Sequence, residues 1–376
     1  MPGAVVVVGG GLMGLSAAWQ LRRADPSVRV VLLERTRVGS AASGASAAGV
    51  RVMGRDPAER ALALESLGRW SQLDRELEGT TGYRRGGGLR VALDDATWAE
   101  APAWVAEQRA DGVPVEVVQA SEARRRAPEV SPACRGGVFC AMDGQAEAEL
   151  TVLAFTNAAR RSQVRLEEGV GADRLIVERG RVVAVARTDG RREACDAAIV
   201  AGGAWSAGLL APHGLTLPFT TRALQMLLTE PAPGALAPVL GAFERKISFK
   251  QLATGAYLIG GGWPAAIPDE PRNRWQVRED SVQASLAVAR ELYPPSAGAK
   301  LARAWAGIEA FTPDDLPVLG RVPGVSGLLV AAGFCGHGFA LAPAVGDVLA
   351  RLALGRDAGE DLWRGLRPAR FMKGHG

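Results

Sequence analysis

The strongest constraint on this fold is a short apolar run that leads directly into three glycines. Residues 4–8 form a continuous apolar stretch of the kind expected for a strand buried on both faces. Gly9, Gly11 and Gly14 follow in the spacing G-x-G-x-x-G, and residues 15–21 have a helical pattern. Gly9 permits a tight turn, Gly11 lets backbone approach a diphosphate, and Gly14 lets helix and strand pack closely. The order strand, glycines, helix predicts a dinucleotide-binding unit.

An acid closes this unit at the position where a ribose-binding residue is needed. Residues 28–33 predict a second strand, which ends at Glu34, and 34 minus 14 gives 20 residues after the last glycine. At that distance a carboxylate can accept hydrogen bonds from ribose hydroxyls. The pattern does not distinguish NAD from FAD, so the identity of the dinucleotide must be inferred from the rest of the sequence.

Composition narrows the class of protein. The 376 residues are enough for two domains, and the net charge of +4 comes from dispersed arginines without interleaved aromatic residues, so nucleic acid is not an expected partner. Four cysteines and three histidines show no metal-ligand spacing. No charge-free apolar stretch reaches about 20 residues, so no membrane span is expected. Free cysteines and the absence of an export signal predict a cytoplasmic protein.

A loop rich in small residues follows the acid. Residues 39–49 consist only of Gly, Ala and Ser, without helical or strand periodicity. Such a loop can lie against a flat or anionic ligand, and the hydroxyls of Ser40, Ser43 and Ser46 are available to phosphate. Arg51 ends the loop, and residues 57–77 predict a long helix.

A second strand–glycine–helix unit lies near the end of the chain. Residues 328–332 predict a buried strand, Gly333, Gly336 and Gly338 a glycine-rich loop, and residues 339–352 a helix. The N-terminus of that helix can stabilise negative charge. An elongated cofactor would use one such helix for its diphosphate and the other for its ring.

The intervening segments predict that the chain visits two domains alternately. The fold class is therefore α/β, with a doubly wound cofactor-binding domain made of discontinuous segments and a second, mainly antiparallel β-sheet domain for the substrate. We assign residues 1–82, 146–215 and 304–376 to the cofactor-binding domain, and residues 83–145 and 216–303 to the substrate domain.

Taken together, these motifs resemble the FAD-dependent D-amino-acid oxidase, sarcosine oxidase and glycine oxidase family. The resemblance covers nearly the whole chain and is carried, in order, by VVVVGGGLMGLSAAWQL, GSAASGASAAG, AIVAGGAWS, FTPDDLPVLG and GLLVAAGFCGHGFALAPAVG. It implies FAD as the cofactor and the two-domain fold described above.

The resemblance also implies a reaction and a set of cofactor contacts. Members oxidise a C–N bond: hydride passes from the carbon beside a neutral amine to flavin N5, and the imine is then hydrolysed. Oxygen or another acceptor takes up the electrons. The implied FAD-binding residues are Gly9, Gly11, Leu12, Met13, Gly14, Glu34, Arg35, Ser40, Ala42, Ser43, Ala47, Ala48, Gly49, Val170, Gly202, Gly333, Gly336, His337, Gly338 and Phe339.

Two departures from the family pattern concern the cofactor. Sarcosine-oxidase-like members hold flavin through a cysteine at the position of Gly307, so non-covalent FAD is expected here. Those members also place an oxygen-activating lysine where this chain has Leu258, and Lys250 is the substitute nearby. A dehydrogenase that passes electrons to another acceptor is therefore an alternative to an oxidase.

Further departures concern the substrate. Glu309 stands where glycine-oxidase-like members carry a carboxylate-binding arginine, and Ala340 replaces a lysine of the sarcosine-oxidase-like members. An acid at this point favours a cationic group, which predicts an amine, or an amino acid with a second amine, as substrate. The alternative is an acid near the cavity mouth that pairs with a neighbouring cationic side chain. Arg51 matches an arginine near the flavin. Arg51, Glu309 and Lys250 are thus the candidate catalytic residues.

Two other functions remain open from the sequence. One is a flavin dehydrogenase for a 2-hydroxy acid or polyol phosphate, which shares this fold. The other is an FAD-binding subunit of a multi-subunit amino-acid dehydrogenase, in which case the chain has a partner subunit; an oligomer is also possible.

Overall fold

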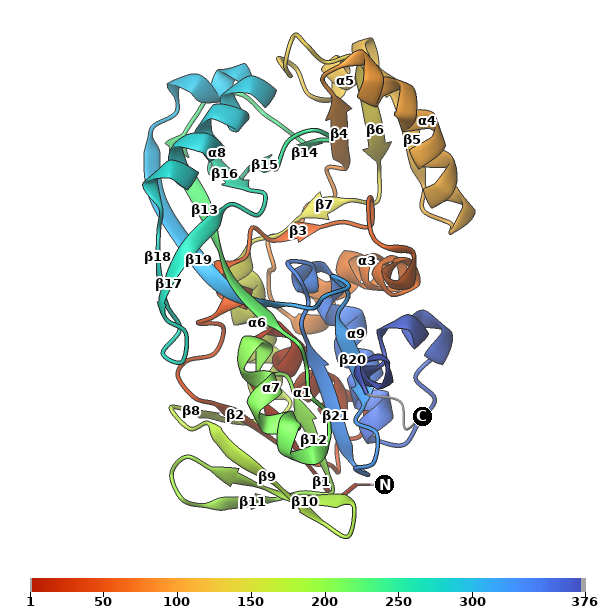
Figure 1. Ribbon diagram of the computed structural model, residues 1–376, viewed down its shortest axis with the longest axis vertical. Helices are drawn as coiled ribbons and strands as arrows, with labels where there is room; N and C mark the ends of the chain where they lie inside the picture. Colours follow the sequence, from red (N-terminus) through yellow and green to blue (C-terminus); the bar gives the residue numbers. More distant parts are fainter. Residues whose placement is uncertain (1, 373–376) are drawn as a thin grey trace.

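A six-stranded sheet built around the first strand forms the lower half of the molecule in Figure 1. The structure, a computed structural model, describes residues 2–372. The four central strands and β8 run parallel, and β20 runs antiparallel at one edge. In spatial order the strands are β20 (Val318–Arg321), β21 (Leu328–Ala332), β12 (Ala197–Val200), β1 (Ala4–Val8), β2 (Arg29–Glu34) and β8 (Arg165–Glu168).

The two faces of this sheet are covered differently. Val5 and Val7 of β1 belong to a core formed with helices, whereas Val6 and Val8 belong to a core formed with a small three-stranded sheet. This division follows from the alternation of side chains along a strand, and it explains why the whole run is apolar. The helices are α1 (Leu12–Ala24), α3 (Pro57–Leu77), α6 (Ala148–Arg161) and α9 (Gly338–Ala353), and the small sheet consists of β9 (Ala172–Glu178), β10 (Arg181–Arg187) and β11 (Arg192–Ala194).

A ten-stranded sheet makes up most of the upper half of Figure 1. It is antiparallel except for the parallel pair of β4 and β14. Its strands are β4 (Gly88–Ala92), β5 (Val115–Gln119), β6 (Gly136–Cys140), β13 (Thr220–Pro231), β14 (Val239–Ala242), β15 (Ser248–Gln251), β16 (Ala256–Gly260), β17 (Pro264–Asp269), β18 (Arg274–Gln276) and β19 (Leu301–Phe311).

One predicted boundary does not coincide with a boundary between the sheets. The sequence assigned residues from 304 onward to the cofactor-binding domain, but β19 pairs with β13 from Leu301 to Phe311. This strand therefore belongs to the ten-stranded sheet as far as Phe311. The reason is a long-range pairing that its own sequence does not reveal. The division of the chain into two domains stays a proposal.

Short elements connect the two sheets. α2 (Ala42–Ala45) is a single helical turn inside the small-residue loop, and β3 (Gly49–Val50) pairs with β7 (Gly144–Gln145). The remaining α-helices of the described residues are α4 (Asp95–Ala110), α5 (Ala120–Arg126), the short α7 (Ser206–Leu210) and α8 (Glu279–Leu292). Among residues 2–372, no helix combines the length and apolar character that crossing a bilayer requires.

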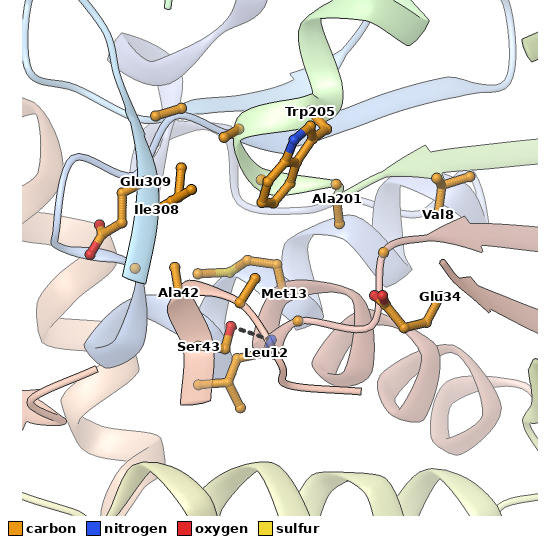
Figure 2. Close-up of a pocket in the computed structure, with 18 of the residues that line it drawn as sticks. Val8, Leu12, Met13, Glu34, Ala42, Ser43, Ala201, Trp205, Ile308 and Glu309 are labelled. Atoms are coloured by element: carbon orange, nitrogen blue, oxygen red, sulfur yellow. Dashed lines mark hydrogen bonds between the residues drawn. The ribbon is translucent and has the colours of Figure 1, made fainter. Parts of the chain in front are cut away.

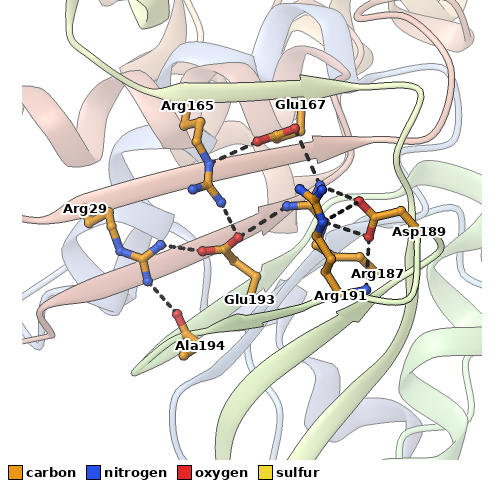
Figure 3. A network of polar contacts seen from close by, with 8 residues as sticks. All are labelled: Arg29, Arg165, Glu167, Arg187, Asp189, Arg191, Glu193 and Ala194. Carbon is orange, nitrogen blue, oxygen red and sulfur yellow. Dashed lines mark hydrogen bonds and ion pairs between the residues drawn. The ribbon is translucent and has the colours of Figure 1, made fainter.

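A polar network attaches the small sheet to the edge of the six-stranded sheet (Figure 3). Glu193 of β11 accepts hydrogen bonds from Arg29 of β2, Arg165 of β8 and Arg187 of β10. Glu193 is only 8% exposed. Because one carboxylate receives three guanidinium groups from three strands, the network fixes the small sheet at this edge.

Candidate cofactor and substrate site

The principal cavity extends between the glycine-rich loops of β1 and β21 and reaches β19. Its volume is about 400 Å³, within the range of small-molecule sites. Figure 2 shows Glu34 and Glu309 at its opposite ends. Of the predicted FAD-binding residues, the following border it: Gly9, Gly11, Leu12, Met13, Glu34, Arg35, Ser40, Ala42, Ser43, Gly202, Gly333, Gly336, Gly338 and Phe339.

The first glycine loop is shaped by close backbone contacts. Gly9 has φ +108°, and a Cβ there would lie 2.4 Å from the carbonyl oxygen of Ala201. A Cβ on Gly14 would lie 1.9 Å from the carbonyl oxygen of Gly9. Gly14 does not border the cavity. Because Gly14 has no Cβ, α1 can begin directly behind the loop. This is the packing role that its place in the spacing predicts.

The N-terminus of α1 contacts the small-residue loop. The N–H of Leu12 donates to Ser43 Oγ over 2.9 Å, a bond drawn in Figure 2, and the N-cap residue Gly11 supplies no side-chain cap. A Cβ on Gly11 would come within 3.0 Å of Ser43 Oγ. Unpaired helix N–H groups and a serine hydroxyl in a glycine cradle are a donor set suited to a diphosphate.

Glu34 is held in one orientation at the other side of this loop. Its Oε2 accepts from the N–H of Gly10 over 2.8 Å, and its Oε1 accepts from the N–H of Thr36 over 2.8 Å. The carbonyl oxygen of Glu34 accepts from the N–H of Val170. Val170 itself does not border the cavity, but Gly171 does. The carboxylate is thus positioned to accept further bonds from a ribose.

Arg35 and Trp205 form the wall beside the acid. The Arg35 guanidinium carbon lies 3.8 Å from the centre of the Trp205 ring, a cation–π contact. Burial lowers the pKa of Arg35 although Glu34 opposes this effect. Trp205 was not among the predicted contacts, but its motif AIVAGGAWS was already conspicuous. Asn273, whose Nδ2 donates to Ser40 O over 3.2 Å, comes from the turn after β17 and had no sequence signal.

The second glycine loop stands at the opposite end, before α9. Gly333 and Gly336 have φ +65° and +78°, and Cys335 between them has φ +51°. A residue with a side chain is strained at a positive φ, so glycine is favoured at positions 333 and 336. The Cys335 sulfur lies 3.3 Å from Thr312 Oγ1, and burial raises the pKa of its thiol.

His337 turns away from the cavity, although its neighbours Gly336 and Gly338 border it. Its Nδ1 lies 3.1 Å from Glu59 Oε2, and Glu59 is completely buried. Burial lowers the pKa of His337, with Glu59 opposing. The His337 side chain thus supports the glycine loop from behind, and a contact of His337 with FAD stays a prediction. Arg55, which pairs with Glu59 at 3.6 Å, had not been predicted.

Glu309 is the charged residue at this end of the cavity. It lies on β19 between Ile308 and Ala310, which also border the cavity. Burial raises the pKa of Glu309 to about 7, and a hydrogen bond from the N–H of Gly336 opposes this effect. Arg222 is its direct partner on β13 but is exposed and lies over the Phe311 ring at 4.5 Å. No cationic side chain among the described residues bordering the cavity stands at this end.

The other two candidate catalytic residues do not border the cavity. The half-buried Arg51 donates from Nη1 to the carbonyl oxygen of Met53 over 2.7 Å, so it folds back onto its own loop. Lys250 donates to the carbonyl oxygens of Ala146 over 2.8 Å and Ala48 over 3.5 Å. Three predicted cofactor contacts also do not border the cavity: Ala47, Ala48 and Gly49.

Lys250 lies across the sheet from the position where the family resemblance implies a lysine. It pairs directly with Leu258, so the two side chains share one face. Burial lowers the pKa of Lys250 to about 7. Its position resembles the expected one, but its amino group is committed to backbone carbonyls.

The residues present fit an FAD molecule. The cavity offers a helix N-terminus with glycines for a diphosphate, a fixed carboxylate for a ribose, and a second helix N-terminus at the far end. Among residues 2–372, no group of side chains could hold a metal ion.

Comparison with known proteins agrees with this fit. Residues 4–352 match the family model described as FAD dependent oxidoreductase. The chain is 32% identical to glycine oxidase of Pseudomonas aeruginosa, over 94% of this chain and 95% of that protein. It is 28% identical to hydrogen cyanide synthase subunit HcnC of the same species, over 93% and 91%.

A solved structure gives the same result in three dimensions. Glycine oxidase from Geobacillus kaustophilus superposes with a TM-score of 0.86 at 25% identity, over 100% of this chain and 99% of that one. With the family match across almost the whole sequence, the geometry and the comparisons agree, and the chain belongs to the family of FAD-dependent oxidoreductases.

Proposed function

We propose that this protein oxidises the C–N bond of an amine, or of an amino acid with a second amine, using non-covalently bound FAD. Bound FAD supplies the hydride acceptor. The similarity to glycine oxidase supports the bond type. The single observation that carries the substrate class is Glu309: it puts a carboxylate at the end of the cavity opposite Glu34, away from cationic lining residues.

Each part of the cavity has a role in this proposal. The α1 N-terminus and Ser43 bind the diphosphate, and Glu34 binds the adjoining ribose. The loop from Gly333 to Phe339 holds the ring through the N-terminus of α9. Glu309 orients the substrate by pairing with its cationic nitrogen. Orientation of the reacting carbon is the main contribution that the protein makes to such a reaction.

The test is an anaerobic reduction experiment on the purified holoenzyme. We expect a member of the panel of amines, diamines and diamino acids to bleach the flavin absorbance, while 2-hydroxy acids and polyol phosphates leave it unchanged. We expect Glu309→Gln to weaken the apparent affinity for the bleaching amine by roughly tenfold or more, because a hydrogen bond between charged groups is lost. Glu230→Gln is the matched control, since Glu230 is an exposed acid of β13 that does not border the cavity.

Two results would contradict the proposal. Bleaching by hydroxy acids or polyol phosphates alone would favour the dehydrogenase alternative. An unchanged amine affinity in Glu309→Gln would remove Glu309 from substrate recognition. Admission of air to the bleached enzyme then decides between oxygen and another acceptor. The commitment of Lys250 to the Ala146 and Ala48 carbonyls favours another acceptor.

A second candidate, an FAD-binding subunit with a protein partner, is favoured by a surface feature. The exposed large apolar side chains of the described residues are Leu153, Trp275 and Leu301. Leu153 and Trp275 line a second hollow of about 600 Å³, and Ser40 borders both this hollow and the principal cavity. Apolar side chains gathered at one hollow are typical of interaction surfaces. The similarity to a hydrogen cyanide synthase subunit supports the same candidate.

We propose a cytoplasmic location as well. All four cysteines are buried and unpaired, which suits a reducing compartment.

A further inference from the structure

Resting on the proposed amine oxidation, we propose that the Glu309 carboxylate accepts a proton from the substrate's ammonium group inside the cavity. Most amines are protonated near neutral pH, whereas hydride leaves only from the carbon beside a neutral nitrogen. An enzyme for such a substrate needs a group that removes this proton or must wait for the rare neutral form. Glu309 stands where that group is needed.

The lining of the cavity offers few alternatives. The ionisable side chains among the described residues that border it are Glu34, Arg35 and Glu309. Both oxygens of Glu34 already accept backbone hydrogen bonds, and Arg35 lies against Trp205. Both are at the ribose end of the cavity. At the ring end only Glu309 can exchange a proton with a substrate.

The groups around Glu309 leave its charge unmatched. From β13, Arg222 is its partner in register but is exposed over the Phe311 ring. From the glycine loop, His337 is turned to Glu59, and the Cys335 sulfur contacts Thr312. The N–H of Gly336 is the one hydrogen bond that lowers its pKa. A carboxylate in these surroundings gains from accepting either a cation or a proton.

The step itself is a simple proton transfer. An N–H bond of the substrate breaks, its electron pair stays on nitrogen, and an O–H bond forms on Glu309. Nothing is oxidised or reduced in this step. Burial lowers the pKa of an ammonium group and raises that of a carboxylic acid, so the cavity brings the two closer together. Burial has already raised the pKa of Glu309 to about 7.

A binding experiment without turnover measures how many protons are released when an amine binds. tert-Butylammonium has no hydrogen on the carbon beside nitrogen and cannot be oxidised. Calorimetry of the holoenzyme in buffers of different ionisation enthalpy counts the protons released. Near pH 6, where free Glu309 is largely protonated, we expect release of about one proton per site, and near pH 9 close to none. Glu309→Gln abolishes the release, Glu309→Asp retains it, and Glu230→Gln behaves like the wild type.

A rate experiment separates proton transfer from mere pairing. Anaerobic flavin reduction is measured at saturating substrate, across pH, for amines that differ in their own pKa. With the wild type we expect one profile that does not follow the amine's pKa. With Glu309→Gln the profile shifts with each amine, because the variant binds the ammonium form and only the fraction of bound substrate that has lost its proton to solvent can react.

The outcomes are distinguishable. Profiles that follow the amine's pKa in both enzymes, or release of protons by Glu309→Gln, would overturn the proton-acceptor role while the proposed substrate class survives. If no amine and no diamino acid reduces the flavin, the proposed function fails.

Discussion

At the scale of single residues, Lys250 was a candidate catalytic residue, but its amino group bonds to the backbone and does not border the cavity. It is 1% exposed, and its amino group donates to the carbonyl oxygens of Ala146 and Ala48. Ala48 has φ +52°, an unfavourable conformation for alanine. A buried ammonium is costly, so the lysine favours its neutral form. We interpret it as a residue that positions the loop before Gly49.

We expect Lys250→Met to change the pH dependence of stability. The folded protein releases the Lys250 proton near pH 7, whereas the unfolded chain holds it until about 10.4. Between these values the unfolded chain binds more protons, so this group makes the free energy of unfolding rise with pH, by a few kcal/mol. Urea unfolding at pH 7 and pH 9.5 should show that rise in the wild type but a smaller one in Lys250→Met.

The control for this measurement is Lys246→Met, because Lys246 is exposed in the loop between β14 and β15. It should retain the wild-type rise. If Lys250→Met also retained it in full, the amino group would be charged in the folded state, and the interpretation would be wrong.

At the scale of elements, the sequence predicted most of the structure with local signals. The helix over 57–77 and the strand over 328–332 have the predicted bounds, because a proline start and an uninterrupted apolar run are local features. α1 begins at Leu12 rather than 15, since the glycine loop itself starts the helix.

The differences between expectation and structure concern elements whose place depends on distant partners. β19 carries Trp305, Glu309 and several alanines, and only its register with β13 places it in the ten-stranded sheet. Likewise, the direction of the Lys250 side chain follows from pairing with β16. The glycine motifs and Glu34 were predictable because the chemistry of a diphosphate and a ribose fixes their spacing.

The attachment of the small sheet allows a prediction at this scale. Burial raises the pKa of Glu193, but hydrogen bonds and charge from Arg29 and Arg165 lower it overall. The stabilisation from its charge is therefore present above its ordinary pKa and is lost as pH falls through the folded value. We expect Glu193→Gln to cost ~1–3 kcal/mol at pH 7, a discounted value because its arginine partners are half exposed.

The same variant should approach the wild type only at a pH well below the ordinary pKa of a glutamate, because the lowered pKa of Glu193 delays its protonation in the folded protein. Thermal unfolding at both pH values measures this. Glu178→Gln is the control, since Glu178 is exposed at the end of β9 and makes no ion pair with the described residues. A difference between wild type and Glu193→Gln that is equal at both pH values would show that the charge contributes nothing.

At the scale of the whole molecule, the mode of cofactor attachment is testable. A Cβ on Gly307 would lie 2.8 Å from Ala45 Cβ, so β19 and α2 leave no room for a side chain there. The position that carries a flavin-linking cysteine in related proteins is thus closed. We expect acid precipitation of the holoenzyme to leave the flavin in the supernatant, measured by absorbance. A yellow pellet would show a covalent bond.

The cavity collects its walls from almost the entire length of the chain, from Val8 to Phe339. When only the first glycine loop and Glu34 have left the ribosome, only half of the binding site exists. The part of the site that holds the flavin ring has not yet been synthesised. Nearly all of the polypeptide must be synthesised before FAD can be enclosed. We therefore expect FAD to bind late, after most of the chain has been synthesised. Its binding would bring the first and last segments of the chain together.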